Sequence, residues 1–237
     1  MTEFMKFPRT SHLAWLSAGS SRDDKVLDAA ERDAFLGQAI VIEEKIDGAN
    51  IGISFTEDLA MRVQNRGQWI NCETGGQFTH LHAWIGPRSD RLLDLLGTTH
   101  ILFGEWCYAR HSVGYDRLPD WFVVFDVYDH GARRFWSTLH RNELARQADL
   151  SVVPAIDLGT FGMTELMGLL SRQSAFGSGP VEGLYLRCES QGFLDARAKL
   201  VRPGFVEQLG EHWSRGSRQV NRLDYALPSP ACPLPQK

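Results

Sequence analysis

A lysine beside a tight-turn signal is the feature of this sequence that could do covalent chemistry. Lys45 precedes Ile46-Asp47-Gly48, and a glycine in such a turn lets the backbone approach a ligand closely. An unperturbed lysine is neutral in only about 1 molecule in 2,500 at pH 7, so it must be activated before it can attack phosphorus. A nearby divalent metal or cationic neighbours would supply that activation. Taken alone, the segment is better explained as a surface hairpin with a solvated lysine.

Two cations alternate near the other end of the sequence. Arg197 and Lys199 flank Ala198, so in a strand both side chains lie on the same face. Two cations on one face are what a clamp on phosphate groups requires. The pair therefore favours a phosphate-containing ligand.

Six segments that contain these residues follow one another in a fixed order. They are Lys45-Ile46-Asp47-Gly48, Gln64-Asn65-Arg66-Gly67, Phe103-Gly104-Glu105-Trp106, Phe122-Val123-Val124-Phe125-Asp126, Val181-Glu182-Gly183-Leu184-Tyr185 and Arg197-Ala198-Lys199-Leu200-Val201. In these segments the chain resembles the covalent nucleotidyltransferase superfamily of ATP-dependent ligases and capping enzymes, most closely its RNA ligase branch. The resemblance extends from about Lys6 to Leu223, and the joint order of six segments is far more specific than any one of them.

The resemblance implies a three-step reaction. Lys45 would attack the α-phosphate of ATP, release pyrophosphate and hold AMP as a phosphoramidate, with Mg²⁺ or Mn²⁺ present. The AMP would pass to an RNA 5′-phosphate, and a 3′-hydroxyl would then displace it. Ends of RNA, or nicks in an RNA-containing duplex, are the partners that we expect.

The resemblance also assigns roles to individual residues. The expected catalytic residues are Lys45, Glu105, Glu182 and Lys199. The expected nucleotide-binding residues are Glu44, Lys45, Asp47, Asn50, Arg66, Glu105, Phe125, Glu182, Arg197 and Lys199, with Phe125 stacking on adenine. The expected metal ligands are Glu105, Glu182 and Asp126, since Mg²⁺ prefers oxygen ligands.

Three of these roles have a simpler alternative in the sequence. Glu182 could be a polar strand residue before a bend, Phe125 a core side chain, and Arg66 a solvated arginine at a strand end. Arg197 is a departure from the family pattern, which more often has lysine at both positions of this segment. Its contribution to the phosphate clamp is therefore the least defined.

The surrounding elements predict an α+β domain of mainly antiparallel sheets flanked by helices. Asp28 and Glu31 have the spacing of a helix capping box. Residues 39–55 predict two strands joined by a tight turn at Asp47-Gly48, with a third strand at 59–67. Apolar periodicity predicts helices within 75–96, 138–150 and 164–172, and a further helix within 204–223. The remaining strands are expected at 99–107, 120–129, 181–189 and 193–202.

Composition sets the outer limits. The 237 residues, with 43% hydrophobic and 23% charged residues, suit a globular protein whose domain spans residues 1–225 and is followed by a disordered proline-rich tail at 226–237. We expect no OB domain, because the residues after Lys199 predict only about one helix. With no apolar run of about 20 residues, we expect a cytoplasmic protein. The spacing of Cys72, Cys107, Cys188 and Cys232 predicts neither a disulfide framework nor a zinc site.

Three rival functions fit the same segments. A DNA ligase would use the same pocket with another acceptor, and an mRNA capping enzyme would use GTP. A nucleotide-binding or RNA-binding module without turnover is disfavoured by the presence of Lys45, Glu105, Glu182 and Lys199, because an inactive site is expected to lose its nucleophile or a carboxylate. The net charge of −4 does not decide among these partners, since a local basic groove can coexist with an acidic remainder.

Overall fold

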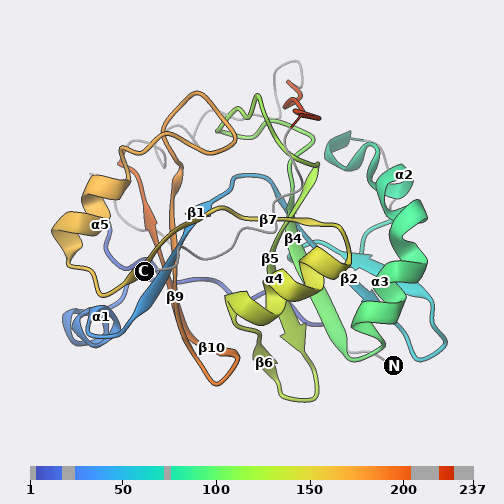
Figure 1. Cartoon of the computed structure of the whole chain (residues 1–237), viewed down its shortest axis with the longest axis horizontal. Helices are drawn as coiled ribbons and strands as arrows, with labels where there is room; N and C mark the ends of the chain where they lie inside the picture. Colours follow the sequence, from blue (N-terminus) through green and yellow to red (C-terminus); the bar gives the residue numbers. More distant parts are fainter. Residues whose placement is uncertain (1–3, 18–24, 72–75, 204–218, 227–237) are drawn as a thin grey trace.

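The computed structural model describes residues 4–17, 25–71, 76–203 and 219–226, and two β-sheets form its framework (Figure 1). The smaller sheet, here called sheet A, has the strand order β10-β9-β1-β8 and is antiparallel throughout. Its strands are β1 (Ile40–Lys45), β8 (Ala155–Gly159), β9 (Gly183–Ser190) and β10 (Phe193–Val201). Strand β8, which no sequence pattern predicted, covers the edge of β1 that β9 leaves open.

The larger sheet, here called sheet B, has the order β3-β2-β4-β5-β6, and β7 pairs with β5 in parallel. Its strands are β2 (Ala49–Phe55), β3 (Met61–Gln64), β4 (His100–Trp106), β5 (Phe122–Asp129), β6 (Arg134–Phe135) and β7 (Ser151–Val152). All of its other strand pairs are antiparallel. The predicted α+β class with mainly antiparallel sheets is confirmed.

Each sheet has its own helices and its own apolar core. The helices α1 (Ala29–Leu36) and α5 (Met163–Leu169) lie at the outer side of sheet A, where Phe35 and Leu166 join its core (Figure 1). At the outer side of sheet B lie α2 (Leu81–Ile85) and α3 (Ser89–Leu96), with short 3₁₀ turns at Gly76–Phe78 and Gly86–Arg88. Helix α4 (Thr138–Gln147) packs against β5 and β7.

The start of α1 follows its local sequence signal. Asp28 caps α1 by accepting from the backbone N–H of Glu31 at 2.8 Å, and Glu31 returns the contact to the Asp28 N–H at 3.0 Å. The predicted capping box is therefore confirmed.

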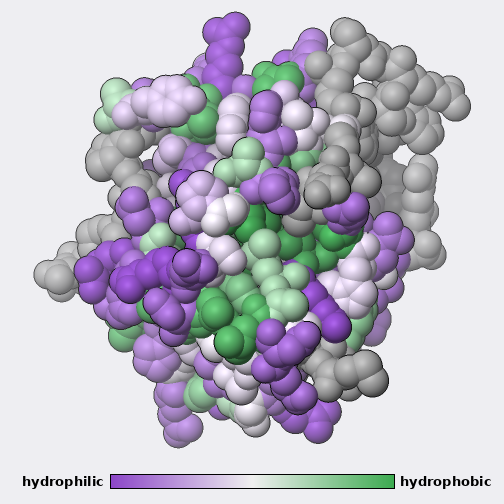
Figure 2. All heavy atoms as spheres, turned by 90° about the vertical axis from the view of Figure 1, so that its right-hand side faces the viewer, coloured by the Kyte–Doolittle hydropathy of each residue, from purple (hydrophilic) through white to green (hydrophobic). Residues whose placement is uncertain are grey.

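Seen from the side of α2 and α3, the surface has a central apolar area bordered by polar side chains (Figure 2). Partly buried residues of this half, such as Ile70 and Leu93, pack against the core of sheet B.

One prediction about the strands is wrong. Strands β1 and β2 do not pair as a hairpin, because β1 pairs with β8 and β9 in sheet A while β2 pairs with β3 and β4 in sheet B. Both strands are buried along nearly their whole length, which is the pattern of interior strands. Residues 46–48 therefore cross from one sheet to the other, and Lys45 lies at the point of crossing.

Most of the helix expected within 204–223, and all but Ala226 of the tail expected at 226–237, lie outside the described residues. Residues 219–223 are not helical. Val220 forms an isolated β-bridge with Ala109, and Leu223 forms one with Leu118.

Cys107 and Cys188 are buried free thiols. Within the part of the chain that the structure describes, no helix has the length and apolar character needed to cross a bilayer.

Candidate active site

Lys45 and Glu182 form the closest charged pair of the site. Lys45 ends β1 opposite Gly183 at the start of β9, so the residue before Gly183 lies beside the lysine side chain. The Nζ atom of Lys45 is 2.6 Å from each carboxylate oxygen of Glu182. The Lys45 side chain keeps 25% of its surface exposed whereas that of Glu182 keeps 5%, so the pair is partly shielded but the lysine stays accessible.

The charges around Lys45 act on its pKa in opposite directions. Burial alone would lower the pKa of Lys45, but the carboxylates of Glu182, Asp47 and Glu105 outweigh it, and the pKa is raised above its ordinary value. For the two glutamates burial acts in the other direction. It is the largest cause that raises the pKa of Glu105 to about 8 and the pKa of Glu182 to about 7. Without nucleotide, Lys45 is therefore held as the ammonium, which is not nucleophilic.

A pocket opens beside this pair at the junction of the two sheets. It brings together most of the nucleotide-binding residues that the sequence predicted, namely Glu44, Lys45, Asn50, Arg66, Glu105, Phe125 and Lys199. It also has a wall that sequence reasoning missed, made of Phe7, Pro8, Thr10, Val153 and Tyr185. Only Tyr185 belonged to a recognised segment, and residues 7–10 carry no motif that could have identified them.

Two buried acceptor atoms in the pocket have no hydrogen-bond partner. Asn50 on β2 lies opposite Glu105 on β4 in the strand register. The Oδ1 of Asn50 and the Oε2 of Glu105 are both buried and unsatisfied among the described residues. A buried polar atom without a partner is costly, so its presence in a pocket indicates a ligand that supplies a donor or a cation.

Glu105 and Glu182 fit a hard divalent cation. Both carboxylates act on the charge of Lys45, and the unsatisfied Oε2 of Glu105 is the oxygen that a cation would take. The described residues contain no cluster of three or more His, Cys, Asp and Glu side chains that could hold a metal. Mg²⁺ is commonly held by one or two carboxylates together with substrate phosphates and water, so two glutamates are sufficient for it.

Arg66 and Phe125 face the pocket from sheet B. Asn65 accepts from the backbone N–H groups of Gly67 and Gln68, a local turn that presents the exposed Arg66 at the rim. Phe125 is half-buried, and its ring meets that of Phe7 edge to face at a centroid distance of 5.3 Å. A ring that is partly exposed inside a pocket is available for stacking on a base.

Glu44 and Asp47 use their carboxylates to fasten loops. Asp47 Oδ2 accepts from the backbone N–H groups of Ser112 and Val113, at 2.7 and 3.0 Å. Glu44 accepts from Ser174 Oγ and from the N–H of Ala175. Their predicted contact with nucleotide stays a prediction, and the structure adds that both residues anchor chain segments around the pocket.

Asp126 and Arg197 lie behind the pocket wall. Asp126 is fully buried, and its carboxylate pairs with Arg187 at 2.6 Å and with Arg197 at 3.3 Å. The Arg197 guanidinium lies over the rings of Phe7 and Phe135. Neither residue lines the pocket, so the structure does not place Asp126 in the pocket with Glu105, nor Arg197 in the pocket with Lys199 as a phosphate clamp.

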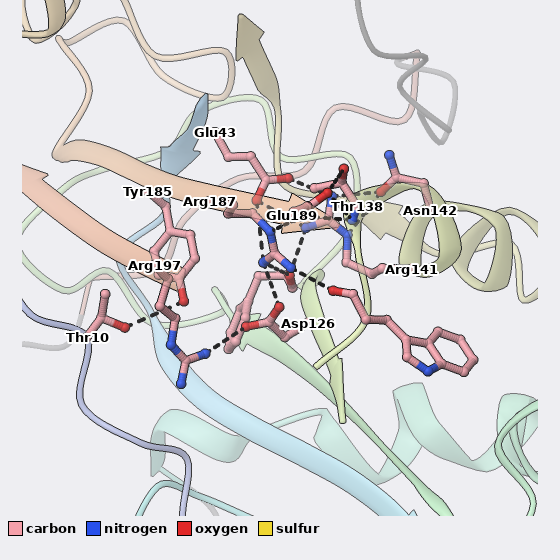
Figure 3. A network of polar contacts seen from close by, with 12 residues as sticks. Thr10, Glu43, Asp126, Thr138, Arg141, Asn142, Tyr185, Arg187, Glu189 and Arg197 are labelled. Carbon is pink, nitrogen blue, oxygen red and sulfur yellow. Dashed lines mark hydrogen bonds and ion pairs between the residues drawn. The ribbon is translucent and has the colours of Figure 1, made fainter. Parts of the chain in front are cut away.

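The two ion pairs of Asp126 belong to a network that joins the sheets (Figure 3). Arg187 of sheet A contacts Asp126 of sheet B and Glu189 of its own strand, each at 2.6 Å. Arg141 of α4 pairs with Glu43 of sheet A at 2.6 Å and also donates to the carbonyl of Phe125 at 2.7 Å. Three arginines and three carboxylates thus compensate each other, and they fix the backbone of Phe125 relative to β1.

Two motif glycines are explained by close backbone approaches. A Cβ on Gly48 would lie 2.8 Å from the carbonyl oxygen of Trp106, and one on Gly183 would lie 2.5 Å from that of Leu200. Any side chain would push β2 from β4, or β9 from β10. The glycines therefore preserve the strand spacing on both sides of Lys45.

The comparisons with known proteins agree with this geometry. The fold resembles the RNA ligase of Naegleria gruberi: its complex with PPi has a TM-score of 0.59 and 18% identity, covering 88% of this chain and 64% of that one. An apo variant gives a TM-score of 0.60 at the same identity and coverage. A variant with ATP and Mn gives 0.58, again at 18% identity and with 88% and 64% covered. This chain thus spans about 64% of the length of those ligases.

The sequence itself gives the family. No curated protein matches the chain significantly. The family model described as RNA ligase matches residues 38–201, a stretch that contains Lys45, Glu105, Glu182 and Lys199. Because this match extends over more than half of the sequence, the chain belongs to the RNA ligase family.

Proposed function

We propose that the protein is an ATP-dependent RNA ligase that uses Lys45 as the nucleophile. The observation that carries the proposal is the contact of Lys45 with Glu182 at 2.6 Å, beside the unsatisfied oxygen of Glu105. A lone lysine would be solvated, whereas this one contacts Glu182 and lines a pocket together with Glu105 and the partly exposed ring of Phe125. Rejoining broken RNA is the role that such an activity would serve.

In the first step the Lys45 Nζ attacks the α-phosphorus of ATP. The N–P bond forms, the bond between the α-phosphorus and its bridging oxygen breaks, and pyrophosphate leaves. Lys45 must first lose the proton that its carboxylate neighbours stabilise. A divalent cation at Glu105 and Glu182 would supply positive charge that disfavours the ammonium and neutralises the phosphates.

The other pocket residues position the nucleotide. Phe125 offers its ring to adenine, Asn50 and Glu105 offer acceptors to ribose hydroxyls or a cation, and Lys199 offers its charge to phosphate. In the second step AMP passes from Lys45 to the 5′-phosphate of RNA. In the third, a 3′-hydroxyl attacks that phosphate and AMP leaves. Holding these groups in line is the main contribution that a protein makes to phosphoryl transfer.

The proposal is tested by labelling with α-³²P nucleotides. With Mg²⁺ or Mn²⁺, ATP should leave one labelled AMP on the protein in an acid-labile, base-stable bond, and GTP should leave none. Lys45→Arg should abolish the label because arginine stays protonated. Lys25→Ala, which changes an exposed lysine away from the pocket, should label normally. An unchanged adduct on Lys45→Arg, or preference for GTP, would overturn the assignment.

A further inference from the structure

A second concave surface, here called the arginine groove, lies at one edge of the molecule. It is formed by residues 110–116, by residues 178–180 with Arg202, and by residues 219–222, whose loops gather at the upper edge in Figure 1. Its volume of about 660 Å³ exceeds the roughly 160 Å³ of the Lys45 pocket. The groove is therefore large enough for an extended ligand rather than for a single small group.

The groove is positively charged although the whole chain is acidic. Its lining contains Arg110, Arg202 and Arg222, with Asp116 as the acidic member, whereas the chain has a net charge of −4. The Nε of Arg202 is buried and lacks a hydrogen-bond partner among the described residues. Guanidinium groups bind phosphate through paired N–H donors, so three of them along a groove suit a chain of phosphates.

The walls of the groove are fastened to each other without a ligand. The backbone N–H of Arg110 donates to Gln219 O at 2.9 Å, and its guanidinium donates to the Gln219 side chain at 2.8 Å. The buried Asn221 accepts from the N–H of Tyr115 and donates to the carbonyl of Cys107. A charged groove that is already ordered loses little entropy on binding.

Both walls of the groove are hydrogen-bonded to the segments that carry the catalytic residues. Ser112, which lines it, donates its backbone N–H to Asp47, two residues after Lys45. Arg202, on the other side, donates its backbone N–H to the carbonyl of Glu182 at 3.0 Å. Both walls are thus attached directly to residues beside the nucleophile, so a strand that lies in the groove runs close to the segments that carry Lys45 and Glu182.

We propose that the arginine groove binds the phosphodiester backbone of the RNA strand whose end enters the Lys45 pocket. This inference rests on the proposed function and assigns a path to its acceptor. The contacts are made to phosphates, so the groove binds RNA without regard to base sequence. Arg110, Arg202 and Arg222 act in binding the strand and have no part in forming lysyl-AMP.

The test measures RNA binding and lysyl-AMP formation separately. A fluorescent single-stranded RNA of mixed sequence is titrated with the full chain and with Arg110→Glu, Arg202→Glu and Arg222→Glu at several salt concentrations. Each reversal should weaken binding about tenfold and lower the salt slope by about 0.7, the value for one phosphate contact on a single strand. Lysyl-AMP formation should stay within about twofold of the unchanged chain.

Three controls separate charge from folding. Arg146→Glu reverses an exposed arginine on α4, outside the groove, and should bind RNA normally. The triple replacement of the groove arginines by lysine keeps the charge and should retain most of the affinity, whereas replacement by glutamine should not. Thermal unfolding of each variant identifies any loss that comes from the fold.

The outcomes distinguish this inference from the proposed function. Undiminished RNA affinity in the folded glutamine triple variant would overturn the groove assignment, even if lysyl-AMP forms normally. Loss of lysyl-AMP formation with unchanged RNA affinity would overturn it too, because the groove would then serve the triphosphate. If the unchanged chain forms no lysyl-AMP, the proposed function fails, while a charge-dependent loss of RNA affinity still supports the groove.

Discussion

Lys45 lies opposite Gly183 in the pairing of β1 with β9, and this register places Glu182 against the lysine side chain. The contact therefore depends on the spacing of strands, and not only on the two side chains. Gly183 is the residue that permits the spacing, because a Cβ there would meet the Leu200 carbonyl at 2.5 Å.

Gly183→Ala should consequently destabilise the protein and slow the formation of lysyl-AMP. Overpacking of this kind costs about 1 to 3 kcal/mol. Gly86→Ala is the matched control, since a Cβ at Gly86 would have no atom within 4 Å and the residue is helical. Thermal unfolding and adduct formation should be near normal in the control. Equal melting temperatures for the two variants would contradict the role of Gly183.

The raised pKa values of Glu105 and Glu182 predict a pH dependence of stability in EDTA. Burial raises the pKa of Glu105 to about 8 and that of Glu182 to about 7, so the folded protein binds these protons more tightly than the unfolded chain does. Their contribution to stability is complete below the ordinary value of 4.5 and is lost as pH rises through 7 to 8. The stability of Glu105→Gln relative to that of the unchanged chain should therefore increase as the pH rises from about 5 to about 9. A constant difference in melting temperature across that range would refute this.

Phe125→Ala should weaken ATP use more than it weakens the fold. Its ring is half-buried and lines the pocket, so truncation removes a stacking contact of about 1 to 3 kcal/mol. Phe103→Ala on the adjacent strand is the comparison, because Phe103 is fully buried and its truncation should cost about 3 to 5 kcal/mol of stability. A larger melting-temperature loss for Phe125→Ala, with normal ATP affinity in the folded fraction, would make Phe125 a core residue instead.

Glu43 and Arg141 should show strong energetic coupling. Both side chains are only 1% exposed, so Glu43→Leu leaves a buried guanidinium without its carboxylate. Loss of one partner of a buried pair costs about 3 to 5 kcal/mol, whereas replacing both by apolar groups is often near neutral. Denaturant unfolding of Glu43→Leu, Arg141→Leu and the double variant measures the coupling. Additive losses in the double variant would show that the pair is not a unit.

Sealing should depend on ribose at the 3′-hydroxyl side of the break. The 2′-hydroxyl is the group by which a protein distinguishes RNA from DNA locally. Nicked duplexes that differ only in having ribose or deoxyribose in the last one or two nucleotides before the 3′-hydroxyl should therefore seal at different rates. The sugar of the 5′-phosphate strand should have much less effect. Equal or faster sealing of the all-DNA nick would replace the RNA acceptor by DNA while leaving the lysine chemistry intact.

Local sequence was sufficient to identify much of the pocket. Lys45, Asn50, Arg66, Glu105 and Lys199 were all predicted from the resemblance of short segments to a known family, and all line the cavity. Each lies in or beside a strand whose apolar pattern or glycine is visible in the sequence. Residue types with a chemical role in a fixed local spacing can be recognised without knowing how the chain folds.

Contacts between distant segments could not be predicted in this way. The strands on either side of Asp47-Gly48 have the pattern of a hairpin, yet both are interior strands of separate sheets. The N-terminal wall with Phe7 is visible only when residues 7–10 and Tyr185 are brought together in space. Asp126 was predicted as a metal ligand from the family resemblance, and its ion pairs with Arg187 and Arg197 could not be foreseen because these partners are more than 60 residues away in sequence.

The crossing of the chain between the sheets also sets the order in which the pocket can be completed. Sheet B is formed by one continuous stretch, residues 49–152, whereas sheet A combines β1 with strands that follow this stretch. During translation, β1 and all of sheet B are synthesised before Glu182 and Lys199. A nascent chain at that stage carries the proposed nucleophile Lys45 but lacks Glu182 and Lys199, the proposed catalytic carboxylate and phosphate-binding cation. The last strands to be synthesised are therefore those that complete the proposed site, so incomplete chains should not form lysyl-AMP.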